Sequence, residues 1–229
     1  MILTRILDLI FPRRCLNCGA KIAGTEAVCA ACFAAIRLNT ALFCGKCGAR
    51  LADGKKICHA DFLYVLGAAT DYADGAVKGL IHALKFKRVS SAAGPLTRLL
   101  VRYAENLRLP LADCLVVPLP LSGRRLRERG FNQSELIAEI FAARFGLPIE
   151  TKNFLRTKNA KAQSETKSLD ERRENIKGCF AVRHPELFRG RKIILIDDVT
   201  TSGATLYEAA LALKSAGARK IIALAVARA

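Results

Sequence analysis

Tryptophan is absent from this chain of 229 residues, and the 11 phenylalanines and 4 tyrosines fall mostly in apolar patterns. Proteins that bind single strands without sequence preference stack bases on exposed rings, so the scarcity of rings argues against such a platform. No apolar run approaches the roughly 20 residues that span a bilayer, and we expect no membrane span. The apolar residues 1–10 are interrupted by Arg5 and Asp8 and precede no small-residue cleavage site, so we expect no signal peptide.

Two common phosphate-binding motifs are also missing. No Gly-x-x-x-x-Gly-Lys-Ser/Thr occurs, and no Gly-x-Gly-x-x-Gly follows a predicted strand, which removes P-loop and dinucleotide-binding domains from the candidates. Histidines are few, and the isolated His82 and His184 suit helix or turn positions better than a general base. Acidic residues are also scarce, with 20 Asp and Glu against 37 Lys and Arg. The net charge of +17 favours polyanionic partners, such as nucleic acid or phosphorylated metabolites.

The most informative segment covers residues 193–205 and reads Ile-Ile-Leu-Ile-Asp-Asp-Val-Thr-Thr-Ser-Gly-Ala-Thr. Its four apolar residues predict a buried strand, with Asp197 and Asp198 at the C-terminal end. A hydroxyl-rich loop and a helical pattern from Leu206 follow. Ligands bind beyond the carboxyl ends of parallel strands, and free N–H groups at a helix start suit a phosphate. The carboxylates suit sugar hydroxyls or magnesium, so the segment indicates a phosphorylated ribose.

This segment resembles the 5-phosphoribosyl-1-pyrophosphate (PRPP) motif of the type I phosphoribosyltransferases. The resemblance implies that the acidic pair holds the ribose 2- and 3-hydroxyls and that the loop wraps the 5-phosphate, with magnesium as a cofactor. The residues that it assigns to PRPP are Asp197, Asp198, Val199, Thr200, Thr201, Ser202, Gly203, Ala204 and Thr205. The alternative is a buried strand followed by a polar turn and a helix cap, because threonine and serine commonly cap helices.

Cysteine spacing predicts metal binding. Six of the nine cysteines form three C-x-x-C pairs within residues 15–47, which in a chain without a secretion signal is typical of metal sites in a reducing cytoplasm. One complete thiolate set for zinc is Cys15, Cys18, Cys29 and Cys32. Half of a second set is Cys44 and Cys47, with Cys58 as the third candidate and His59 or Asp61 as the fourth. An interleaved pairing, in which Cys15 and Cys18 share an ion with Cys44 and Cys47, remains open.

Alternating patterns predict an α/β domain with a largely parallel sheet. Strands are expected at 62–72, 115–117, 193–196 and 221–226, and helices at 75–86, 91–107 and 132–145. The composition becomes apolar near residue 62, so we divide the chain into a cysteine-rich module, residues 1–61, and the α/β domain, residues 62–229. The basic residues 124–129 are expected in a loop, and most of residues 152–178 in a long mobile loop.

Nearly the whole chain is similar to the ComF family (ComFC and GntX-like proteins). The matching features, in family order, are the cysteine module, Leu84-Lys85-Phe86, residues 116–121, Arg124 to Ser134 with its Arg-Gly-Phe-Asn-Gln run, Gln163, residues 169–176 and the PRPP motif. The resemblance implies a type I phosphoribosyltransferase-like fold, a mostly parallel sheet flanked by helices, with a small N-terminal zinc-ribbon-type module. It also implies a PRPP site with a poorly defined acceptor and, in some members, a role in natural transformation on incoming single-stranded DNA. Where relatives commonly have a fourth C-x-x-C pair, this chain has Cys58-His59-Ala60-Asp61.

The leaving pyrophosphate of such a transferase requires cations and N–H donors around it. The pyrophosphate candidates, in the segment after the strand at 115–117 and at the first helix, are Leu119, Pro120, Leu121, Ser122, Arg124, Arg125 and Lys85. The charge stabilisers expected in the mobile loop, which could close over the site, are Arg156, Lys158 and Lys161. The predicted function is phosphoribosyl transfer from PRPP to an unknown acceptor. The alternative is a non-catalytic protein that binds single-stranded nucleic acid through its basic surface and zinc module.

Overall fold

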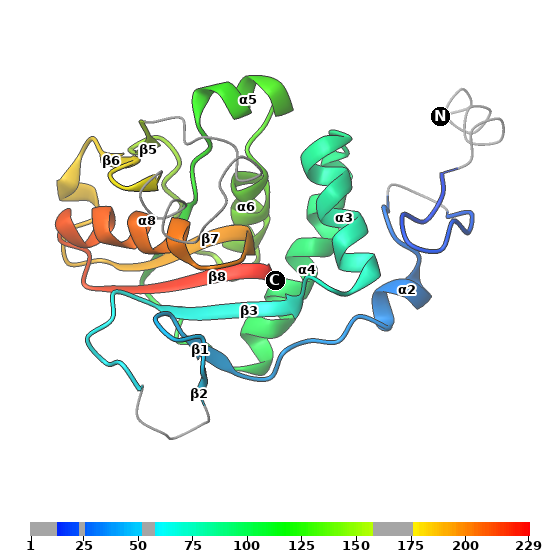
Figure 1. Cartoon of the computed structure of the whole chain (residues 1–229), viewed down its shortest axis with the longest axis horizontal. Coiled ribbons are helices and arrows are strands. Elements are labelled where there is room, and N and C mark those ends of the chain that lie inside the picture. The colour runs from blue at the N-terminus through cyan, green and yellow to red at the C-terminus, as the bar shows by residue number, and fades with distance from the viewer. Residues whose placement is uncertain (1–12, 23–25, 52–57, 158–175) are drawn as a thin grey trace.

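The computed structural model describes residues 13–22, 26–51, 58–157 and 176–229. Its central feature is a six-stranded sheet in the order β2-β1-β3-β8-β7-β4 (Figure 1). The strands are β1 (Leu42–Cys44), β2 (Arg50–Leu51), β3 (Val65–Asp71), β4 (Cys114–Pro118), β7 (Lys192–Thr200) and β8 (Lys220–Arg228). Strands β3, β8, β7 and β4 are parallel, and β1 runs antiparallel to both β2 and β3. The predicted α/β fold with a mostly parallel sheet is confirmed.

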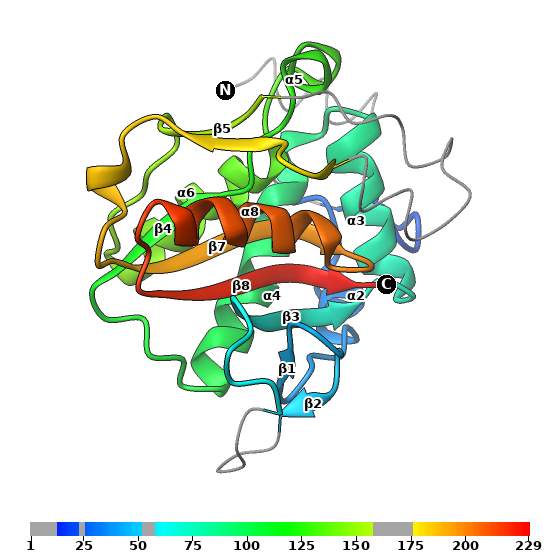
Figure 2. The same cartoon turned by 60° about the vertical axis from the view of Figure 1, so that its left-hand side comes forward.

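Helices cover both faces of this sheet, as expected for parallel strands whose residues are buried on both sides. Helices α4 (Ala93–Asn106) and α6 (Gln133–Phe145) pack on one face, and α8 (Ala204–Ser215) packs on the other (Figure 2). Helix α3 (Gly75–Phe86) continues into the 3-10 turn η1 (Ser90–Ala92) and packs against α4. The helices predicted at 75–86, 91–107 and 132–145 are therefore present. Among the described residues, no helix has the length and apolar character of a membrane span.

Three details of the sequence prediction were wrong. Strand β7 continues to Thr200, so the acidic pair lies within the strand and not beyond its end. The arginine run forms helix α5 (Gly123–Arg129) and not a loop, because the Ser122 side chain caps its start and Gly130, with φ of 84°, ends it. At the start of the expected loop lies a strand that we did not predict, β5 (Phe154–Arg156), which pairs with β6 (Phe180–Val182) beyond the end of that loop. Residues 158–175 of that loop lie outside the described residues.

The cysteine-rich segment is joined to the α/β domain by backbone and side-chain contacts. Strand β1 extends the main sheet from β3, and the buried Tyr103 hydroxyl of α4 donates to the Ala41 carbonyl at 2.6 Å. Glu26, in the N-terminal part of the cysteine-rich segment, forms a two-pronged ion pair with Arg98 of α4 at 2.8 and 2.9 Å. Short helix α2 (Ala30–Ala34) lies beside α3 in Figure 1. The division of the chain into two domains, residues 1–61 and 62–229, remains a prediction.

Candidate functional site

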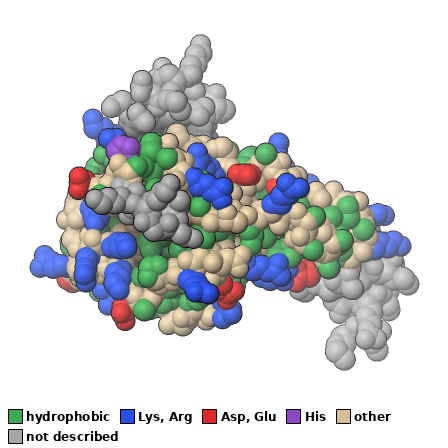
Figure 3. All heavy atoms as spheres, turned by 90° about the horizontal axis from the view of Figure 1, so that it is seen from below, with side chains coloured by type: hydrophobic (Ala, Val, Ile, Leu, Met, Phe, Trp, Pro, Cys, Tyr) green, Lys and Arg blue, Asp and Glu red, His purple; other side chains and the backbone are tan. Residues whose placement is uncertain are grey.

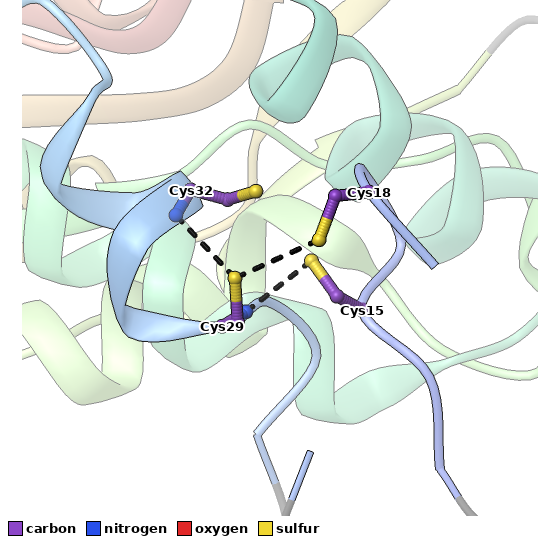
Figure 4. Close-up of side chains that lie close together, drawn as sticks. All are labelled: Cys15, Cys18, Cys29 and Cys32. Carbon is purple, nitrogen blue, oxygen red and sulfur yellow. Dashed lines mark hydrogen bonds between the residues drawn. The ribbon is translucent and has the colours of Figure 1, made fainter. Parts of the chain in front are cut away.

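Four cysteine sulfurs converge at the N-terminal end of the described chain, as Figure 4 shows. The ligand atoms of Cys15, Cys18, Cys29 and Cys32 all lie within 4.8 Å of one another, and the Cys18 and Cys29 sulfurs are 3.8 Å apart. Cys29 caps α2, so the helix start directs both of its cysteines toward the first pair. Four thiolates at such separations are the donor set of a structural zinc site.

A second donor set forms around the turn between β1 and β2. Its members Cys44, Cys47, Cys58 and His59 also have ligand atoms within 4.8 Å of one another. The Cys47 and Cys58 sulfurs are 3.5 Å apart, and His59 Nδ1 lies 3.4 Å from the Cys44 sulfur. The structure therefore pairs the cysteines in sequence order rather than interleaved, and the candidate fourth donor is His59 and not Asp61.

One buried thiol in each set is predisposed to ionise. Burial raises the pKa of Cys15, but the N–H groups of Cys18 and Cys29 outweigh it and lower that pKa to about 6. Burial likewise opposes ionisation of Cys44, while the backbone N–H of Cys47 is the largest of the hydrogen bonds that lower its pKa to about 6. Because the thiolate is the metal-binding form, both sets fit a divalent metal ion such as zinc.

The acidic pair lies buried at the C-terminal part of β7. Asp197 is 9% exposed and Asp198 is 5% exposed. Burial, followed by the charge of Asp198, raises the pKa of Asp197 to about 7. Lys85, near the end of α3, forms an ion pair with Asp198 at 2.8 Å, which brings the predicted lysine to the predicted carboxylates. Ser134 donates to Asp197 Oδ1 at 3.0 Å, and so does the Asp198 N–H at 2.8 Å.

The segment 129–134 supplies site residues that we did not predict. Asn132 caps α6 and donates through its side chain to the Leu119 carbonyl at 3.1 Å, while Ser134 holds Asp197. Arg129 donates to the buried Gln133 side chain at 2.8 Å, and the Gln133 amide nitrogen has no hydrogen-bond partner among the described residues. One short segment therefore connects the turn after β4 to the acidic pair. The signal was the Arg-Gly-Phe-Asn-Gln run, which indicated a family but no role.

Basic side chains surround the pair. Burial lowers the pKa of Arg129, and the nearby carboxylates of Asp198 and Asp197 oppose that shift. Arg156 on β5 is also buried enough for its pKa to fall, and Arg125 adds to this by repulsion. Arg124 instead pairs with Glu128 at 2.8 Å on the exposed side of α5. Arg129 and Arg156 are thus near enough to the acidic pair to feel its charge, and Arg125 is near enough to both arginines to repel them.

The predicted pyrophosphate turn follows β4 directly. The Leu119 N–H donates to the Ile196 carbonyl at 2.8 Å, which fixes the turn beside β7. Pro120 and Leu121 are half-buried, and Ser122 caps α5. Lys158 and Lys161, predicted as charge stabilisers, lie outside the described residues.

The predicted phosphate loop follows β7 at the start of α8. Thr200 is buried, Thr201 and Ser202 are exposed, and Gly203 adopts φ of 73° as the residue before the helix. A left-handed backbone at this position favours glycine. The helix then begins at Ala204, two residues earlier than the pattern from Leu206 indicated. The first N–H groups of a helix have no intrahelical acceptor, so this turn has the donors that a phosphate requires.

Comparison with known proteins agrees with both parts of the chain. Residues 6–60 match the family model of the double zinc ribbon domain, and residues 132–229 match that of the phosphoribosyl transferase domain. DNA utilization protein YhgH of Escherichia coli O157:H7 is 35% identical over 162 residues, 68% of each chain. Competence protein F of Haemophilus influenzae is 34% identical over 158 residues, 66% of this chain and 67% of that protein. These alignments span about two thirds of each relative.

Among solved structures, glutamine PRPP amidotransferase from B. subtilis, complexed with ADP and GMP, aligns with a TM-score of 0.40 and 16% identity. The alignment covers 60% of this chain and 26% of that chain.

Proposed function

Because the chain belongs to the ComF family, whose members include DNA utilization protein YhgH and competence protein F, we propose that it binds PRPP with magnesium and transfers the phosphoribosyl group to an acceptor. One observation supports this proposal: the buried pair Asp197–Asp198 lies in the C-terminal part of β7, and the turn before α8 follows it directly. The two carboxylates would accept hydrogen bonds from the ribose hydroxyls, and the N–H groups of the turn that follows them would donate to the 5-phosphate. The acceptor is not identified by any residue described above.

Magnesium fits the donor set, because carboxylate oxygens are its preferred protein ligands. Asp197 and Asp198 would hold the ion together with the ribose hydroxyls. When bound, it supplies positive charge toward the ribose and the pyrophosphate. Lys85 forms an ion pair with Asp198, and Ser134 donates to Asp197, so the protein's own side chains hold both carboxylates in place.

The leaving pyrophosphate carries several negative charges, which fixed cations stabilise in a site that excludes water. We assign Arg125 and Arg129, with the backbone N–H groups of Leu121 and Ser122 in the turn after β4, to that role. Asn132 keeps this turn attached to α6 by its bond to the Leu119 carbonyl. The bond from the sugar C1 to the pyrophosphate oxygen breaks as a nitrogen of the acceptor bonds to C1. The cations hold the departing oxygens, and the proton of the acceptor nitrogen passes to the departing pyrophosphate.

The acidic pair gives the sharpest test. A variant with both Asp197→Asn and Asp198→Asn keeps the size of each side chain but removes the charges, and we expect it to lose PRPP binding. The matched control is Asp113→Asn, since Asp113 is exposed before β4 and its φ of 61° suits asparagine. Equilibrium dialysis with PRPP and magnesium measures both variants. Normal PRPP binding by the double variant would refute the site.

A second function, binding of single-stranded DNA, is supported by the charge of +17 and by helix α5. No residue of α5 is buried, and its Arg124 and Arg127 are exposed. On the face in Figure 3, lysine and arginine side chains are spread over the surface rather than collected in one band. We expect binding that weakens steeply with salt, and Arg127→Gln should reduce the slope of log affinity against log salt by about 0.7. If the affinity for an oligonucleotide, measured by filter binding, did not change with salt concentration, binding through phosphate contacts would be excluded.

A further inference from the structure

The second metal-donor set and the phosphate loop are separated by only a few side chains. Gly45 directly follows the donor Cys44, and Phe62 and Tyr64 follow the donors Cys58 and His59. The Phe62 N–H donates to the His59 carbonyl at 3.1 Å, which ties this short segment to the donor set. Two stretches of chain that begin at metal donors therefore lead to the same place.

That place is the start of α8. The Tyr64 hydroxyl lies 3.3 Å from the Gly203 carbonyl and 3.5 Å from the Gly45 carbonyl, so its single proton can be donated to either. Tyr64 is 3% exposed, and a Cβ on Gly203 would lie 3.0 Å from its hydroxyl oxygen. Gly203 of the phosphate loop therefore lies in direct contact with the Tyr64 hydroxyl.

Packing and a second hydrogen bond strengthen the connection. A Cβ on Gly45 would lie 2.6 Å from the Tyr64 carbonyl oxygen and 2.8 Å from the Phe62 ring, so only glycine fits there. The Phe62 ring lies 5.6 Å from the Tyr207 ring of α8. Arg228, paired in register with Thr200, donates to the Gly48 carbonyl at 3.0 Å. A cavity of about 370 Å³ lies between the donor-set turn and the loop, with Lys46 and Ser202 in its wall.

The first donor set has a different neighbour. A Cβ on Gly79 of α3 would lie 3.3 Å from the Leu16 carbonyl, and one on Gly75 would lie 3.4 Å from the Asn17 side chain. The segment between Cys15 and Cys18 thus contacts α3, the helix that carries Lys85. The two donor sets are therefore placed to support different parts of the site.

We propose that the second donor set, when it holds its metal, positions the phosphate loop through Tyr64, which is a positioning residue and not a catalytic one. The proposal rests on the proposed function, because it assigns the 5-phosphate to this loop. It states that metal occupancy and ribose 5-phosphate affinity are linked. The pyrophosphate half of the site, built from α5, α6 and Lys85, should be insensitive to the same change.

The experiment compares two partial ligands on the full-length, zinc-loaded protein by calorimetry. Ribose 5-phosphate probes the loop, and magnesium pyrophosphate probes the other half. We expect Tyr64→Phe to weaken ribose 5-phosphate about three- to tenfold, the loss of one hydrogen bond, and to leave pyrophosphate unchanged. The control Tyr103→Phe also removes a buried hydroxyl bonded to a backbone carbonyl, that of Ala41, and should change neither affinity. A general structural role would weaken both ligands or neither.

Metal removal is tested separately. Cys58→Ser should release the metal of the second set and reproduce the ribose 5-phosphate loss, whereas Cys18→Ser in the first set should not. Amide exchange at Ser202, Gly203 and Ala204, measured without ligand, should accelerate in Tyr64→Phe and Cys58→Ser but not in Tyr103→Phe. Equal exchange in all variants would overturn the proposal. Wild-type protein that binds neither partial ligand nor PRPP would instead refute the proposed function, and the exchange result would still decide the linkage.

Discussion

Replacing Asp197 by asparagine should stabilise the folded protein at neutral pH while it destroys the substrate site. The carboxyl is buried, and its pKa rises from 3.8 to about 7 on folding. Asparagine has nearly the same shape, and its side-chain oxygen can accept the bonds that Ser134 and the Asp198 N–H now donate to Asp197. The substitution therefore removes an unfavourable buried charge and preserves its hydrogen bonds.

The sign and size follow from proton linkage. An acid whose pKa is raised on folding binds more protons in the folded state, so its contribution to stability is present below pH 4 and lost as pH rises toward 7. A rise of the Asp197 pKa from 3.8 to about 7 corresponds to roughly 4 kcal/mol as an upper limit. We therefore expect the unfolding free energy of Asp197→Asn, minus that of the wild type, to increase by about 2–4 kcal/mol between pH 4 and pH 8.

Urea unfolding followed by circular dichroism at several pH values measures this difference. The wild type and Asp197→Asn have the same metal-donor sets, so any effect of pH on those sets cancels in the difference. The matched variant is Asp198→Asn, which leaves the Lys85 ammonium without the carboxylate 2.8 Å away. Because Lys85 is 21% exposed, we expect a loss of about 1–2 kcal/mol, below that of a fully buried pair. The same Asp→Asn substitution at these two adjacent positions should thus change the unfolding free energy in opposite directions. A destabilised Asp197→Asn, with a difference that does not depend on pH, would refute the reasoning.

Three further predictions concern the donor sets, the loop and the turn after β4. Metal analysis should find two zinc ions per chain in wild type and in Asp61→Ala but one in His59→Ala; two ions in His59→Ala would return Asp61 as a candidate ligand. Gly203→Ala should lose about 1 kcal/mol of stability, since its φ is 73°, and should bind ribose 5-phosphate more weakly; a neutral result in thermal unfolding would show that the loop relaxes. Asn132→Ala removes the cap of α6 and the hydrogen bond to the Leu119 carbonyl, so we expect the unfolding free energy to fall by about 1–2 kcal/mol and pyrophosphate to bind more weakly. An unchanged pyrophosphate affinity would show that Asn132 has no part in the site.

Much of the fold was predictable because its local signals agree. The run around Ile193–Ile196 is apolar on both faces, as expected for a central parallel strand, and Gly146 ends α6 with φ of 63°. Helix α5 was not predicted, since arginines with one leucine show no apolar period; its cap at Ser122 was the available signal. The short β5–β6 pair has only three residues in each strand, too few to show a strand period.

The site was predictable to the extent that its residues are contiguous in sequence. The acidic pair and the turn after β7 form one stretch of sequence, and they lie in the C-terminal part of β7 and directly after it. The contacts of Lys85 with Asp198 and of Ser134 with Asp197 join residues far apart in the chain, which spacing cannot indicate. The same holds for the second donor set, in which the sequence left His59 and Asp61 open as the fourth ligand and the fold placed Cys58 and His59 beside Cys44 and Cys47.

Calorimetric titration of the wild-type protein with PRPP, with and without magnesium at moderate salt, tests the central claim most directly. The account predicts saturable binding that requires magnesium and that disappears in the Asp197→Asn, Asp198→Asn double variant. Absence of binding under both conditions would contradict it, and would leave the basic surface and single-stranded DNA as the subject of further work.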